Sequence, residues 1–392
     1  MALIKKYWSN KKVIIAGIVI ILFLAVLILA DNNYCFYHKT IASVKSVQEK
    51  YIESQEGPNG EQEKYYIQRV KAVVRNGIYK GKEINFKNTY SYSGIKNEKY
   101  QSGEDIFIEI SENDGKLSGT VSGIKRDKYV VFLVGLFVTA LVLITGKQGL
   151  LTLLSLLVNI LIFILAVGFY SKGKDFEILC FVMVILFNCL TLLILGGISR
   201  KTIGAMVSTL LAVAATYFIY TIVTFIEHPS YELMDYIVAP NDLGKIFMAG
   251  IIIGCLGAIM DVAITMNSAV HEFAHTAEHL TWKSLIKSIQ EIGYDIMGTM
   301  INVLLFTYIS GSLPGIILKI KNGYSLNTLV QFNIVFEIIR FLVGSIGIIL
   351  AIPISGFIAV VFLKKEGING NVSNLKHYIF NFNCFSRWRK RR

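Results

Sequence analysis

The sequence predicts a mainly α-helical fold, a polytopic membrane bundle of about eight transmembrane helices with a small extracytoplasmic β-rich domain. Three observations support this fold class. The 392 residues are 54% hydrophobic and only 17% charged, a balance that excludes an ordinary soluble enzyme. Apolar runs long enough to cross a bilayer recur along the chain. A polar stretch after the first run alternates in the two-residue period of β-strands.

The positive charge and the cysteines point in the same direction. The net charge of +12 would suggest nucleic acid as a partner of a soluble protein. Here the charge is concentrated in the termini and short loops, where it orients a chain in the bilayer, so no nucleic acid is expected. The cysteines are scattered and include no CxxC pair, which indicates neither a disulfide framework nor a cysteine zinc site.

Residues 1–30 are predicted to form a short cytoplasmic N-terminus and a signal-anchor helix. A lysine-rich start without acidic residues precedes the apolar run Val13–Ala30. The run is long and its end, LILADNN, is a poor cleavage site, so a retained anchor is expected rather than a cleaved signal peptide. The positive charge before the run places the N-terminus in the cytoplasm.

Residues 31–128 are predicted to form an extracytoplasmic β-rich domain. The runs EKYYIQRVKAVV, EDIFIEI and KLSGTVSGI alternate in polarity, and the breaks GPNG and ENDG separate strands. About five short strands fit a small antiparallel barrel or sandwich, which protects its edges by closing on itself. The basic residues Arg69, Lys71 and Arg75 are interpreted as a solvated strand face, with ligand binding as the less favoured alternative.

Residues 129–363 are predicted to form the transmembrane bundle, and residues 364–392 a basic cytoplasmic tail. The bundle contains seven further apolar runs, namely Val130–Thr145, Gly149–Phe169, Phe176–Gly196, Ile203–Ile226, Ile246–Met266, Ile292–Ile309 and Phe341–Leu363. With the anchor the number of crossings is even, which places both termini inside. The acidic loop after Ile226 lies outside and the tail FSRWRKRR inside, as the positive-inside rule requires.

Two of these runs carry carboxylates. On Ile246–Met266, Gly250, Gly254, Gly257 and Asp261 stand at offsets that share one helix face. Glycines let another helix approach closely, and the same face delivers a carboxylate into that contact. An ionisable side chain in a membrane helix is costly, so Asp261 is expected to face the bundle interior or a wet path.

A second polar face is expected on Ile292–Ile309. Asp295, Thr299 and Asn302 repeat the same spacing there. Together with Asp261 they predict a polar path for a proton or cation near the inner side of the membrane. Two plainer interpretations stay open: the carboxylates cap helix breaks, or they contact water among the lipid headgroups.

The last hydrophobic region begins with polar residues. Glu337 and Arg340 are three residues apart, close enough to pair on one helix face. They either belong to the same pathway or neutralise each other at the outer interface. Gly344, Gly347 and Pro353 follow, so close packing and a kink near Pro353 are expected.

A histidine-rich segment supplies an alternative hypothesis. His271, Glu272 and His275 match H-E-x-x-H, in which two histidines hold zinc and the glutamate activates a bound water. Glu291 is the candidate third ligand. The separation between His275 and Glu291 is short for a ligand from a second helix, so the favoured interpretation has no cofactor, and zinc belongs only to the alternative.

Three stretches resemble one known family: GCLGAIMDVAITMNSAVHEF, GYDIMGTMINVLLFTYISGSLP and FEIIRFLVGSIGIILAIPISGF. They are similar to the YibE/F family, over roughly Thr145–Leu363, and the leading anchor and β-rich segment resemble its longer, YibE-like members. The resemblance implies a multi-pass protein of the bacterial cytoplasmic membrane, often paired with a shorter sister protein, without an established activity.

The family pattern carries over to particular positions of this sequence. It covers Gly254, Gly257, Asp261, Glu272, Gly293, Asp295, Gly298, Thr299, Asn302, Glu337 and Arg340. Gly298 joins the helix-packing glycines. Tyr294 stands where the pattern has a basic residue, so Asp295 needs another partner. The pattern includes Glu272 but not both flanking histidines or Glu291, which weakens the zinc hypothesis.

These observations lead to one expectation and two alternatives. We expect a transporter or permease in which Asp261 and Asp295 bind or relay a proton or cation, with Thr299, Asn302, Glu337 and Arg340 along the route. The alternatives are a membrane-embedded zinc metalloprotease and a non-catalytic assembly subunit. The expected partners are the lipid bilayer and either a shorter sister protein or a second copy of the chain.

Overall fold

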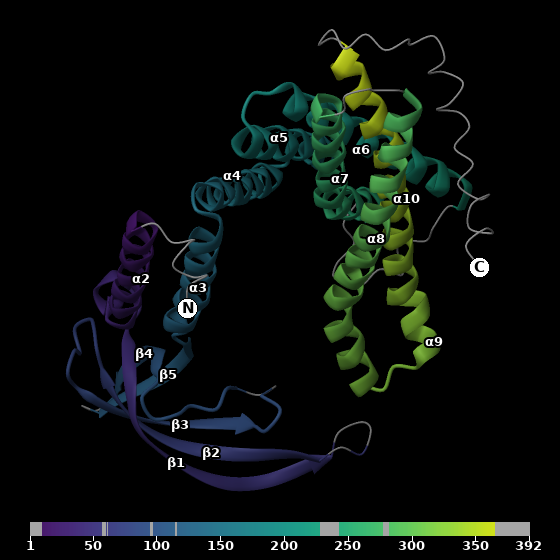
Figure 1. Cartoon of the computed structure of the whole chain (residues 1–392). Helices are drawn as coiled ribbons and strands as arrows, with labels where there is room; N and C mark the ends of the chain where they lie inside the picture. Colours follow the sequence, from purple (N-terminus) through teal and green to yellow (C-terminus); the bar gives the residue numbers. More distant parts are fainter. Residues whose placement is uncertain are drawn as a thin grey trace, which may run out of the picture. The chain divides into compact units, whose positions relative to one another are not determined.

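The structure is a computed structural model of the chain, which describes residues 10–56, 60, 62–94, 97–113, 116–227, 243–276 and 282–364 (Figure 1). The chain divides into two compact units, Met1–Leu150 and Leu151–Arg392. The first holds the sheet and two helices, and the second holds the helical bundle.

The two helices of the first unit pack against each other. They are α2 (Asn10–Asp31) and α3 (Asp127–Thr145), and the rings of Phe23 and Phe132 meet with centroids 6.1 Å apart. A Cβ atom at Gly135 would lie 2.3 Å from the Phe23 ring, so only glycine lets that ring reach the backbone of α3. A short 3₁₀ turn, η1 (Asn33–Phe36), follows α2.

The β-rich prediction is confirmed by one antiparallel sheet with the strand order β3-β2-β1-β4-β5. The strands are β1 (Ile41–Glu56), β2 (Gln62–Val74), β3 (Glu83–Ser91), β4 (Asp105–Asn113) and β5 (Lys116–Ile124). The two edge strands, β3 and β5, contact each other, so the sheet curls toward closure.

The inner face of this sheet holds the core of the first unit. On β2 the buried residues Val70, Ala72 and Val74 alternate with exposed Arg69 and Lys71. This is the alternation that the sequence predicts for a strand with one buried and one solvated face.

The second unit consists of helices. They are α4 (Lys147–Tyr170), α5 (Phe176–Gly196), α6 (Arg200–Glu227), α7 (Leu243–Thr276), α8 (Trp282–Lys321), α9 (Leu326–Leu329), the π-helical turn η3 (Val330–Ile334) and α10 (Val335–Lys364). In the described part of the chain, seven helices are long and apolar enough to cross a membrane, and α2 adds a shorter apolar helix, Ala16–Asp31. The predicted polytopic helical bundle with a small β domain is therefore confirmed.

Several helices are longer than the apolar runs that predicted them. The run Ile292–Ile309 lies inside the 40-residue helix α8, which also contains Pro314. Hydropathy marks only the part of a helix that matches the lipid, whereas backbone hydrogen bonding continues into its polar ends.

The core of the second unit is formed around α7, which packs against α5, α6, α8 and α10. The predicted close packing of α10 is present: a Cβ atom at Gly347 would lie 2.3 Å from Thr216 Oγ1 on α6, and one at Gly344 2.8 Å from Leu304 on α8. Helix α10 continues through Pro353.

Candidate functional site

One face of α7 remains open although the rest of this helix is enclosed. Gly250, Gly254, Gly257 and Asp261 are all exposed, whereas Ile251, Ile252, Cys255, Ile259 and Val262 are at most 1% exposed. We call Gly250, Gly254, Gly257 and Asp261 the α7 stripe. These four residues thus lie on one face of α7, and in the described part of the chain no other helix covers most of this face.

Tyr308 of α8 reaches the α7 stripe at Gly254. A Cβ atom at Gly254 would lie 2.5 Å from the Tyr308 hydroxyl oxygen, so this contact needs glycine. The hydroxyl is buried and has no hydrogen-bond partner among the residues that the structure describes. A buried hydroxyl without a partner costs free energy, and such groups concentrate at functional positions.

An ion pair lies beside Gly250, at the N-terminal end of the same stripe. The Arg340 Nη1 atom donates to Glu337 Oε1 at 2.7 Å, and the two side chains are only 19% and 20% exposed. The guanidinium carbon of Arg340 also lies 4.9 Å from the centre of the Phe247 ring on α7, a cation–π contact. The pairing agrees with the three-residue spacing in the sequence.

Two glycines of the α7 stripe connect this pair with Tyr308. A Cβ atom at Gly250 would lie 3.9 Å from Arg340 Nε, and one helical turn later Gly254 contacts Tyr308. Tyr308 lies within electrostatic range of both Glu337 and Arg340. We call Tyr308, Glu337 and Arg340 the polar cluster; it joins α8 and α10 at the α7 stripe.

The irregular backbone before α10 helps to position this cluster. The π-helical turn η3 ends at Ile334, three residues before Glu337. Lys319 at the end of α8 donates to Asn333 Oδ1 within this turn at 2.9 Å. Because π-helical turns are rare and recur at functional sites, this segment is more typical of a functional site than of a helix that only anchors the chain in the membrane.

Asp261 lies on the same stripe, seven residues beyond Gly254, or about 10 Å along the helix axis. Its side chain is exposed, and no hydrogen bond or ion pair joins it to another described residue. The stripe therefore connects Asp261 with the polar cluster along one side of α7.

The predicted residues of α8 lie elsewhere on their helix. The packed face of α8 includes Gly293 and Leu304, which contact Ile352 and Gly344 of α10. Asp295 stands on the opposite side of the helix from Leu304, because nine residues correspond to two and a half turns.

The neighbours of Asp295 share this outward position. Asp295, Thr299, Asn302 and Gly298 are exposed, and a Cβ atom at Gly298 would meet nothing within 4 Å. Thr299 and Asn302 donate to backbone oxygens of α8 itself, at 2.8 Å each. Among the described residues, no contact joins Asp295 to Asp261.

The histidine segment lies only partly within the described chain. His271 and Glu272 belong to the last turns of α7, whereas the side chain of His275 lies outside the described residues. Glu291 pairs with Lys287 at 3.6 Å on the surface of α8. No group of three His, Cys, Asp or Glu side chains suited to a metal occurs among the described residues. The zinc hypothesis stays a prediction.

Sequence reasoning did not select Tyr308 or Phe247. Both are aromatic residues inside apolar runs, where composition makes them look like core residues. The one sequence signal that could have found Tyr308 is a hydroxyl-bearing ring in an apolar helix, and that signal is weak because such rings often anchor helices at membrane interfaces.

The comparisons with known proteins agree with this architecture. The model described as YibE/F-like protein matches residues 133–365, and that of the YibE/F family N-terminal domain matches residues 35–124. No curated protein and no solved structure matches the chain. The two family models cover both the helical bundle and the β-rich domain, so the chain belongs to the YibE/F family.

Proposed function

We propose that this integral membrane protein is a permease in which Asp261 binds the transported or coupling cation, a proton or a metal cation. The observation that carries the proposal is Asp261 itself, a carboxylate without a partner among the described residues, on a glycine stripe of an otherwise enclosed apolar helix. A carboxylate on a membrane-spanning helix is costly unless a proton, a cation or water compensates its charge.

The polar cluster supports a route for the cation along α7. Tyr308 offers a hydroxyl, and the Glu337–Arg340 pair provides a fixed dipole at the other end of the same stripe. A proton or cation that leaves Asp261 would meet polar groups there rather than hydrocarbon. Asp261 is thus the binding group, and Tyr308, Glu337 and Arg340 are positioning residues.

The polar face of α8 calls for a second subunit in this proposal. Asp295, Thr299 and Asn302 face away from α10, and the α7 stripe is largely uncovered. A second copy of the chain, or a shorter sister protein of the family, would complete the path by covering both faces. The bilayer concerned is proposed to be the bacterial cytoplasmic membrane, with both termini inside and residues 31–128 outside.

The test is cation flux in liposomes that contain the purified protein. An entrapped pH-sensitive dye reports proton entry under an imposed pH gradient, and entrapped dyes for Na⁺ and Mg²⁺ report the other cations. The protein should conduct one of these faster than empty liposomes, and Asp261→Asn should lower that flux at least about tenfold. Asp295→Asn should lower it less.

Glu291→Gln is the matched control, because it also removes one carboxylate from the bundle, but from an exposed ion pair. It should leave the flux unchanged. Full flux in Asp261→Asn, or no flux of any of the three cations, would exclude the proposal.

A further inference from the structure

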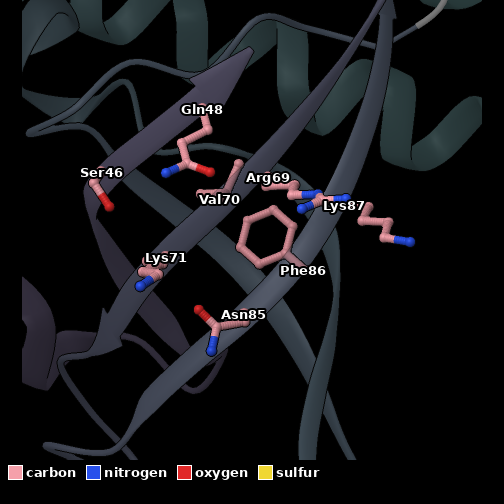
Figure 2. A pocket seen from close by; sticks show the side chains of 8 residues that line it. All are labelled: Ser46, Gln48, Arg69, Val70, Lys71, Asn85, Phe86 and Lys87. Carbon is pink, nitrogen blue, oxygen red and sulfur yellow. The ribbon is translucent and has the colours of Figure 1, made fainter. Parts of the chain in front are cut away.

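The outer face of the sheet contains a hollow that the transport proposal does not use. Its volume is about 360 Å³, and it lies across β1, β2 and β3 (Figure 2). We call it the basic hollow; it is lined by Ser46, Gln48, Arg69, Val70, Lys71, Asn85, Phe86 and Lys87. A volume in this range suits a small-molecule ligand.

Strand register assembles the polar lining in two rows. In one row Ser46 of β1 is opposite Lys71 of β2, which is opposite Asn85 of β3. Val70 belongs to the core on the inner face, and alternation turns its neighbours in β2 outward.

The second row places two positive charges side by side. Gln48 is opposite Arg69, and Arg69 is directly opposite Lys87. Like charges directly opposite each other destabilise a sheet. The lining contains no acidic residue, and no ion pair to Arg69, Lys71 or Lys87 occurs among the described residues.

Elsewhere in the same domain, lysines do have acidic partners. Lys45 lies 3.4 Å from Glu83, and Lys99 lies 2.8 Å from Glu49. Arg75, which the sequence grouped with Arg69 and Lys71, donates to Ser43 Oγ at 2.8 Å and is not part of the hollow. Some lysines of the domain are thus neutralised by carboxylates, whereas three cations without an acidic partner among the described residues lie together in the basic hollow.

We propose that the basic hollow binds a small ligand that carries at least two anionic groups, phosphate or carboxylate. The Cβ atoms of Arg69 and Lys71 are two residues apart on one strand, about 7 Å, and Lys87 lies about 5 Å across from Arg69. One anionic group would bind between Arg69 and Lys87, and a second at Lys71. Gln48, Asn85 and Ser46 add hydrogen-bonding groups for polar parts of the ligand.

The experiment is calorimetric titration of the full-length protein in phosphatidylcholine nanodiscs. Pyrophosphate and citrate are the probes, and acetate is the singly charged comparison. Pyrophosphate or citrate should bind, acetate should bind more weakly, and added salt should weaken the binding. The triple variant Arg69→Gln, Lys71→Gln, Lys87→Gln should lose at least about tenfold in affinity.

A second triple variant, Lys39→Gln, Lys64→Gln, Lys80→Gln, removes the same charge from exposed sites of the domain outside the hollow. Its affinity should stay within about twofold of the original. Nanodiscs that contain phosphatidylglycerol test whether the bound anion is a lipid headgroup or a free molecule. If lipid headgroups occupy the hollow, the original protein binds pyrophosphate more weakly in these nanodiscs than in phosphatidylcholine nanodiscs. The Arg69, Lys71 and Lys87 triple variant should show no such difference between the two lipids. Equal losses in both triple variants, or no binding of either probe, would overturn the proposal.

Discussion

Two groups of polar side chains, one in each unit of this protein, differ in how they are bonded. At the base of the sheet, Tyr34 donates to Asp105 at 2.9 Å, Asn33 donates to Asp127 at 3.0 Å, and Lys125 lies 3.5 Å from Asp127. In the bundle, Tyr308 and Asp261 have no such partner among the described residues. The first arrangement is a connected network, whereas Tyr308 and Asp261 are single groups.

This difference separates polar groups that stabilise the structure from polar groups for which we infer a function. A network of mutually bonded polar groups fixes a unique geometry. Burial and the hydrogen bond to Asp105 raise the pKa of Tyr34, so its hydroxyl stays a donor at neutral pH. Single polar groups in an apolar bundle do not stabilise the fold in this way. We therefore infer that they serve a ligand, a cation or a partner subunit.

The largest expected effect comes from the ion pair between Glu337 and Arg340 in the bundle. Arg340→Leu leaves the Glu337 carboxylate four-fifths buried beside apolar residues and removes the contact with Phe247. The variant should lose about 2–3 kcal/mol of stability, below the range for a fully buried pair because about a fifth of each side chain is exposed. Thermal unfolding in nanodiscs measures this.

The double variant Glu337→Leu, Arg340→Leu distinguishes charge burial from lost packing. If the stranded carboxylate causes the loss, the double variant is more stable than Arg340→Leu alone. A double variant that is less stable than Arg340→Leu would show that the pair stabilises mainly by packing.

The next effect tests the hydrogen-bonded polar groups at the base of the sheet. The Asn76 side chain accepts from Ile41 N at 2.6 Å and donates to the backbone oxygens of Tyr34, Tyr37 and Lys39. Asn76→Ala removes all of these bonds and should cost about 2 kcal/mol in thermal unfolding. Asn32→Ala loses one exposed bond, to Ile28 O, and should cost less than about 0.5 kcal/mol. Equal costs would show that the network adds nothing beyond single bonds.

A smaller effect is expected where α7 and α8 touch. Gly254→Ala puts a methyl group 2.5 Å from the Tyr308 hydroxyl, so Tyr308 must shift, at a cost of about 1–2 kcal/mol. Tyr308→Phe removes a buried hydroxyl that has no partner among the described residues, and should leave stability unchanged or raise it by up to about 1 kcal/mol.

Combining the two changes makes the test sharp. In the double variant the methyl group replaces the hydroxyl in the same space, so its cost should be smaller than that of Gly254→Ala alone. Additive costs would show that Gly254 is needed for another reason, such as contact with a partner helix.

Much of this fold could be predicted from the sequence because local patterns determine it. Alternation around Val70 predicts strand β2, and the apolar run Ile246–Met266 predicts α7. The spacing of Glu337 and Arg340 predicts a pair within one helix. Each of these follows from residues close together in the chain.

The candidate site depended on contacts that no local pattern contains. Gly254 and Tyr308 meet although 54 residues separate them, and Arg69 meets Lys87 across two strands. Helical spacing alone also cannot say whether Asp295 faces inward, because that depends on which side of α8 packs against α10. The sequence therefore indicated the polar faces without showing which of them meet.

The smallest expected effect is the pH dependence of an ion pair in the sheet domain. The hydrogen bond from Lys99 lowers the pKa of Glu49 below its ordinary value of 4.5; the two atoms are 2.8 Å apart. Because Glu49 binds its proton less readily in the folded state, the stabilisation is present above about pH 4.5 and is lost as pH falls through the lowered pKa. Half of the Lys99 side chain is exposed, so water screens the pair and only a few tenths of a kcal/mol are expected.

Comparing the native protein with Glu49→Gln isolates this contribution. The native protein should be slightly more stable at about pH 7, and the difference should shrink as the pH falls through the lowered pKa and vanish once Glu49 is protonated in both the folded and the unfolded state. Lys45→Gln, which removes an exposed ion pair with Glu83, should give a still smaller difference. A difference that grows as the pH falls would mean that Glu49 is held protonated rather than charged, and the sheet domain would then resemble the bundle in storing an unpaired carboxyl group.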